Sequence, residues 1–149
     1  MKRILSTAAI AVAAFAGGLL TAHELQRADA ASPPLKAQVV NVAALSYADL
    51  PPSKPGTLRK QMFVDDGEGM TMGVYVGPTP KHYHAKSNEF QYIVKGSGRE
   101  WFGAQRLTLK PGMLLIIPKG TPHGGVTGDV SMLEMKSPPQ DPDDNHRIK

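Results

Sequence analysis

Three histidines and one glutamate have side chains and spacings that suit the binding of a metal ion. His82 and His84 form an H-x-H pair, Glu89 follows within a few residues, and His123 comes after a second stretch rich in turn residues. Residues i and i+2 of a β-strand point to the same face, about 6.6 Å apart along the strand, so the two imidazoles can converge on one ion. Taken alone, each histidine is also compatible with a hydrogen-bonded strand residue that binds no metal. Only the pattern of all four residues together can distinguish the two interpretations.

Glu89 is expected to point into the interior of the fold. It alternates with Phe90, Tyr92 and Val94, and therefore faces inward if those three pack outside. An unpaired carboxylate is costly to bury, and a metal ion removes that cost. Three imidazole nitrogens and one carboxylate suit a divalent ion such as Fe, Mn, Ni, Cu or Zn, and leave two positions of an octahedral shell open.

The composition excludes several other kinds of site. The chain contains no cysteine, which rules out disulfides, thiolate ligands and cysteine nucleophiles. Its formal net charge of +4 is spread thinly, and no basic run indicates binding of nucleic acid. A chain of 149 residues with 41% hydrophobic residues is typical of one globular domain.

The body of the chain consists of short β-type runs separated by turn signals. We expect strands in eight segments, at residues 39–45, 58–64, 70–76, 90–94, 100–102, 106–109, 113–117 and 130–135. Turns are expected at residues 53–56 and 65–67, and no amphipathic helix is evident after the N-terminal segment. This spacing predicts an all-β sandwich or barrel. The polar, proline-broken segment 138–149 is expected to wrap the surface or to remain mobile.

The N-terminal segment has the layout of a secretory signal peptide. A positive pair at residues 2–3 precedes an apolar run at 8–20, and small residues occupy positions 28 and 30. The prediction is a signal peptide over residues 1–30, a mature chain that begins near Ala31, and a periplasmic or secreted location without stable membrane insertion after cleavage. The alternative is an uncleaved anchor, although the Ala and Gly content makes the segment a poor one.

Two segments resemble the two conserved motifs of the cupin superfamily. HYHAKSNEFQYIVKG, residues 82–96, is similar to the first motif, and GMLLIIPKGTPH, residues 112–123, is similar to the second. The resemblance implies a single jelly-roll-type β-barrel, here residues 35–137 followed by the tail at 138–149. It also implies one divalent metal ion, held by His82, His84, Glu89 and His123.

Glycine and proline residues within these motifs are expected to shape the backbone. Gly96, Gly112 and Gly120 occur where the chain must turn tightly with positive φ, and Pro118 precedes the last of these turns. Two positions depart from the family pattern. Val76 occupies the place of a usual glycine, and Thr127 the place of a frequent asparagine. Neither is a ligand, so the departures bear on the subfamily more than on metal binding.

The cupin resemblance leaves several functions open, because the superfamily contains oxygenases, isomerases, lyases and non-catalytic binding proteins. The first hypothesis is a metal-dependent enzyme of the oxygenase type that acts on a small organic molecule. The second is a non-catalytic periplasmic protein that binds a sugar or an anion through the metal. The third is an isomerase or lyase, which needs a general base that the sequence does not reveal. We also expect a homodimer.

Other side chains are candidates by residue type alone. Glu100 and Glu134 are candidates for an acid–base pair by residue type only, and we expect both to be exposed. Apolar residues that can line a pocket, or else form ordinary barrel core, are Met62, Met72, Tyr75, Trp101, Met113 and Met132.

Overall fold

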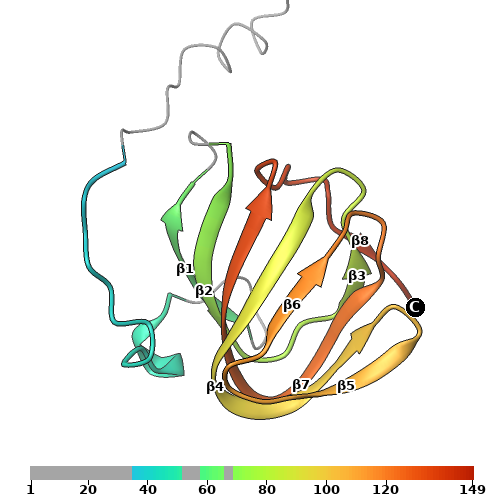
Figure 1. The fold of residues 1–149 in the computed structure, drawn as a ribbon, viewed down its shortest axis with the longest axis horizontal. Coiled ribbons are helices and arrows are strands. Elements are labelled where there is room, and N and C mark those ends of the chain that lie inside the picture. The colour runs from blue at the N-terminus through green and yellow to red at the C-terminus, as the bar shows by residue number, and fades with distance from the viewer. Residues whose placement is uncertain (1–34, 52–57, 66–68) are drawn as a thin grey trace, which may run out of the picture. The chain divides into compact units, whose positions relative to one another are not determined.

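The computed structural model describes residues 35–51, 58–65 and 69–149. Eight strands form one all-β sheet that curls into a barrel (Figure 1). The strands are β1 (Arg59–Val64), β2 (Thr71–Val76), β3 (Lys81–Tyr83), β4 (Asn88–Phe102), β5 (Gln105–Leu109), β6 (Leu114–Ile117), β7 (His123–Ser137) and β8 (His146–Arg147). The described helical structure is the short 3-10 helix η1 (Tyr47–Asp49), and no described helix is long and apolar enough to cross a membrane. The predicted all-β class is confirmed.

Two long strands, β4 and β7, organise the barrel. Each has 15 residues, and they pair antiparallel along their length while both curve strongly (Figure 1). Around the C-terminal half of β7 and the N-terminal half of β4, the neighbours run β1-β2-β7-β4-β6. Around their other halves, the order is β8-β3-β7-β4-β5. Because β4 and β7 run through both parts of the sheet, side chains of both parts point into one barrel interior.

Glycines allow β4 and β7 to approach where they bend. A Cβ atom at Gly96 would lie 1.7 Å from the Asp129 carbonyl oxygen, and one at Gly98 would lie 2.0 Å from that of Thr127. Gly96 also has a φ of 84°, which other residues rarely adopt. The prediction of separate strands at 90–94 and 100–102 is therefore wrong, because Gly96 and Gly98 lie within one continuous bent strand. Gly112 and Gly120 have positive φ in turns, as expected.

The N-terminal part of the described chain packs on the outside of the barrel instead of forming a strand. Residues 39–45, predicted as a strand, contain a turn closed by a hydrogen bond from Ala44 N to Asn41 O, 3.1 Å long. Val42, Leu45 and Leu50 pack against the outward side chains of β2. The predicted signal peptide and the turn at 53–56 lie outside the described residues, as does most of the turn at 65–67.

The interior of the barrel has an apolar region and a polar region. The buried apolar cluster consists of Tyr75, Ile93, Leu109, Leu115, Ile117, Val126, Val130 and Met132. Of the apolar candidates, Met62 and Met113 pack against this cluster, whereas Met72 alternates onto the opposite face of β2. Trp101 is half-buried, with the ammonium of Lys81 4.4 Å from its ring centre. The polar region adjoins this apolar cluster. It is formed by the neighbouring inward-facing residues of β2, β4 and β7, and the predicted ligands lie beside them.

Candidate metal centre

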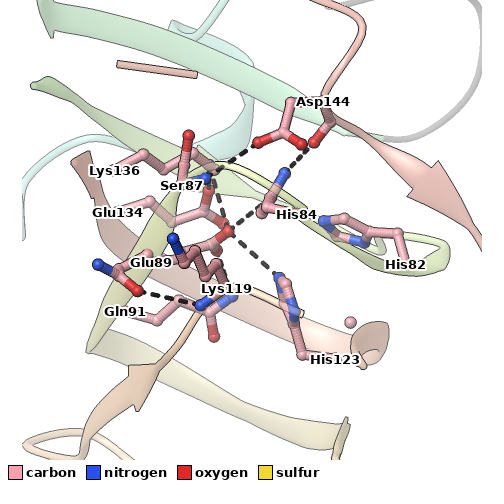
Figure 2. Close-up of polar contacts among 12 residues, drawn as sticks. His82, His84, Ser87, Glu89, Gln91, Lys119, His123, Glu134, Lys136 and Asp144 are labelled. Atoms are coloured by element: carbon pink, nitrogen blue, oxygen red, sulfur yellow. Dashed lines mark hydrogen bonds and ion pairs between the residues drawn. The ribbon is translucent and has the colours of Figure 1, made fainter. Parts of the chain in front are cut away.

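The four predicted ligands lie together in the polar region (Figure 2). His82 is on β3 and pairs with His123 at the start of β7, while His84 follows β3 and Glu89 is near the start of β4. Their candidate ligand atoms all lie within 4.8 Å of one another, and all four residues are buried. The structure thus brings together residues from three strands. Their binding of a metal ion stays a prediction.

Backbone carbonyl groups orient the three imidazoles. The Nδ1 atom of His82 lies 2.8 Å from the Pro80 oxygen, and that of His123 lies 2.9 Å from the Thr121 oxygen. The Nδ1 atom of His84 contacts the carbonyl oxygen of Asp144. Because a carbonyl oxygen can only accept, each Nδ1 must donate, and a neutral ring then carries its free lone pair on Nε2. Such second contacts are how proteins prepare histidines for metal coordination.

The Nε2 atoms of His84 and His123 face a carboxylate oxygen of Glu89, which is an acceptor. The lone pair on Nε2 of a neutral ring is also an acceptor, so a donor or a cation is needed between them. His84 Nε2 lies 2.9 Å and His123 Nε2 3.2 Å from Oε2 of Glu89. Among the described residues, His84 Nε2 has no partner with hydrogen-bond geometry. A divalent cation between these atoms would satisfy the lone pairs and the carboxylate together. The buried, preoriented donor set therefore fits a transition-metal ion such as Fe, Mn, Ni, Cu or Zn.

Electrostatics favour the protonation states that a metal site needs for two of the ligands. Burial, aided by the nearby His123, lowers the pKa of His82 to about 4, so this ring is neutral at pH 7. Burial opposes ionisation of Glu89, but the charge of Lys136 and the contacts with the rings of His123 and His84 outweigh it and hold its pKa well below the usual range. A neutral imidazole and an ionised carboxylate are both ready to coordinate.

Buried charged and polar residues that were not expected in the barrel interior surround Glu89. The Nζ atom of Lys136 lies 2.9 Å from Oε2 of Glu134 and 3.5 Å from Oε2 of Glu89. Gln91 Nε2 donates to Glu89 Oε1 at 2.8 Å. The expectation that Glu134 is exposed is wrong, since only 4% of it is accessible. The alternation of side chains along a strand could have predicted this burial, because Glu134 and Lys136 lie on the same face of β7 as the core residue Met132.

Glu100 is also buried, contrary to expectation, with 0% exposure. Its Oε1 accepts a hydrogen bond of 3.0 Å from the backbone N–H of Gly124, the residue after His123. Its Oε2 has no hydrogen-bond partner in the described part of the chain. Burial raises the pKa of this carboxyl to about 7, so protonated and ionised forms coexist near neutral pH. The interior therefore contains a carboxyl group that can hold or release a proton.

Comparisons with known proteins agree with the architecture and with the motif assignment. Residues 71–135 match the family model of the cupin domain. No curated protein matches the chain significantly. The matched region runs from β2 through most of β7 and includes all four predicted ligands.

Several solved structures share this fold at low sequence identity. A variant of Streptomyces PAC13 with uridine is 14% identical, covers 70% of this chain and 88% of its own, and has a TM-score of 0.58. The protein TT1209 from Thermus thermophilus is 23% identical over 66% of this chain and 99% of its own, with a TM-score of 0.53. Ectoine synthase from P. lautus is 14% identical over 65% and 80%, with a TM-score of 0.53.

Proposed function

We propose that the protein is a metal-dependent cupin enzyme that modifies a small organic molecule. The observation that carries the proposal is the convergence of His82, His84, Glu89 and His123 within 4.8 Å, in a buried position. Two proteins of this fold support the substrate class, since Pac13 is described as a nucleoside dehydratase and another as ectoine synthase. A bound divalent ion would supply a Lewis acid that polarises an oxygen of the substrate.

Proton transfer is the reaction type that the surrounding residues favour. Lys136, Glu134 and Glu100 are buried within the same polar region, and groups of these types serve as general acids and bases. We propose that this set supplies the acid–base partner that isomerase or lyase chemistry requires. In this mechanism Lys136 holds Glu89 ionised, and Glu100 or Glu134 exchanges a proton with the substrate.

An oxygenase is the second candidate. Four protein ligands leave two positions of an octahedral shell for a substrate or dioxygen, which motivates this alternative. The two chemistries differ in their requirement for oxygen, so turnover under air and under argon separates them. A non-catalytic binding protein would bind its ligand in both atmospheres without forming a product.

The experiment compares the metal content and turnover of the wild type with those of a His82→Ala/His84→Ala variant. We expect about one equivalent of a transition metal in the wild type and none in the variant, because two of four ligands are lost. The reconstituted proteins are then incubated with small polar compounds, including nucleosides, and products are measured by mass spectrometry. Failure of the wild type to bind any of the five metals would refute the proposal, and metal binding without product in any assay would favour the binding protein.

We further propose that the barrel works outside the cytoplasm after removal of residues 1–30. The support is the positive pair, apolar run and small residues of the N-terminal segment. In that compartment copper and zinc compete strongly, because the affinity series favours them over iron and manganese. N-terminal sequencing of exported protein should give a start near Ala31, whereas an intact Met1 in the membrane fraction would show an anchor.

A further inference from the structure

We propose that the C-terminal segment, residues 141–149, holds His84 in the orientation that metal binding requires, and that Asp144 is the positioning residue. The proposal rests on the proposed function, because His84 is a ligand of the proposed metal. The segment lies beyond the cupin domain match, which ends at residue 135. Its role is therefore a property of this chain that the matched motifs do not contain.

The side chain of Asp144 binds the turn that follows His84. Its Oδ1 accepts a hydrogen bond of 2.7 Å from Ala85 N, and both carboxylate oxygens lie 3.1 Å from Lys86 N. Its Oδ2 also accepts from Ser87 N at 3.1 Å. Asp144 is fully buried, at 0% exposure. Three consecutive backbone donors thus share one carboxylate. Ser87 is buried, so losing the carboxylate would leave its N–H unpaired away from water.

The main chain of the same residue holds the imidazole. The carbonyl oxygen of Asp144 faces Nδ1 of His84, which turns Nε2 toward Glu89 (Figure 2). The carbonyl oxygen of Asp144 thus holds the ring of His84, and its side chain holds the turn that follows His84. A shift of Asp144 would therefore release the ring and the backbone that carries it at the same time.

His84 depends on a distant segment in a way that the other two histidines do not. The carbonyl partners of His82 and His123 are two residues earlier in the chain, at Pro80 and Thr121. The partner of His84 is 60 residues away. Local backbone geometry can orient the first two rings, whereas the third requires the C-terminal segment to be in place.

The segment is held against the site by further contacts. Strand β8 pairs with β3, the strand of His82, and Ile148 N donates to Lys81 O at 3.0 Å. The ion pair between Lys86 and Asp141 is exposed, and such pairs contribute little. Among these contacts Asp144 alone combines complete burial with direct contact to a predicted ligand. It is therefore the residue at which to test the proposal.

The test measures Co²⁺ binding by the full-length chain with Asp144→Ala and with the matched control Asp143→Ala. The neighbouring Asp143 is exposed, and its backbone N–H, which alanine keeps, donates to Oδ1 of Asp141. Asp144→Ala keeps the carbonyl oxygen but removes the carboxylate that holds the turn after His84. We expect it to weaken Co²⁺ binding about 10- to 100-fold, the range typical of losing a group that orients a metal ligand. Its visible absorption spectrum should also change, because the geometry of the ligands changes. Asp143→Ala should match the wild type in both measurements.

The possible outcomes separate this proposal from the proposed function. A folded Asp144→Ala protein with wild-type Co²⁺ affinity and spectrum would overturn the positioning role while leaving the metal site intact. If near-ultraviolet circular dichroism shows that Asp144→Ala does not fold, Asp144→Asn decides. The amide keeps one acceptor oxygen, so we expect a smaller loss of affinity, and wild-type binding would overturn the proposal. A wild type that binds neither Co²⁺ nor any of the five metals named above overturns both.

Discussion

Removing the metal ion from the loaded protein should lower its melting temperature by about 10 °C. The ligands come from β3 with its following turn, from β4 and from β7, so one ion links three strands. Binding to the folded state alone contributes about 4 kcal/mol when free metal exceeds the dissociation constant 1,000-fold. For a chain of this size each kcal/mol shifts the melting temperature by about 2–4 °C. Calorimetry before and after treatment with a chelator measures the difference.

The control for this prediction is the His82→Ala/His84→Ala variant under the same treatment. Because it lacks two ligands, its melting temperature should not respond to the chelator. An unchanged transition in the wild type, after metal analysis has verified removal, would contradict the prediction. An equal shift in both proteins would mean that the chelator acts elsewhere.

The sequence predicted the cluster because its geometry depends on local features. The H-x-H spacing, the alternation that turns Glu89 inward and the turn glycines around β6 are all visible in short windows. The structure confirms these local features, including positive φ at Gly112 and Gly120. Their convergence required only that the strands form one barrel, which the motif order indicated.

The bend in β4 and β7 could not be predicted from the same windows. A glycine in a strand pattern reads as an interruption, and the glycines between residues 94 and 100 therefore predict two separate strands. In the barrel their missing side chains allow the backbone of β7 to pass closely. Whether a glycine ends a strand or permits a crossing depends on the partner strand, which the local sequence does not identify.

The buried charges were missed for a related reason. By residue type alone glutamate and lysine are expected at the surface, and the polar, proline-broken segment around Asp144 is expected to wrap the surface or to remain mobile. Asp144 is buried because it binds backbone donors of a turn far away in the chain. Glu134 and Lys136 are buried because β7 places them beside Glu89. Only the tertiary pairing supplies the partners that make such burial tolerable.

Replacing Lys136 with methionine should destabilise the metal-free protein by about 3–5 kcal/mol, the usual cost of removing one partner from a buried ion pair. The side chain is buried between Glu134 and Glu89, and both carboxylates lose a cation. Burial lowers the pKa of Lys136, but the two carboxylates outweigh it and raise the pKa, so the ammonium is charged in the folded state. Methionine has a similar length and no charge, so the variant removes the ion pair with little change in volume. Urea denaturation measures the free energy of unfolding.

A second substitution tests whether the cost comes from the unpaired carboxylates. Glu134→Gln combined with Lys136→Met removes one of the two buried carboxylates that lose their cation, so the double variant should be more stable than Lys136→Met alone. The exposed Lys119→Met is the matched control and should change stability by less than about 0.5 kcal/mol. If the single and double variants lose the same free energy, packing of the lysine stem, and not its charge, holds this part of the barrel together.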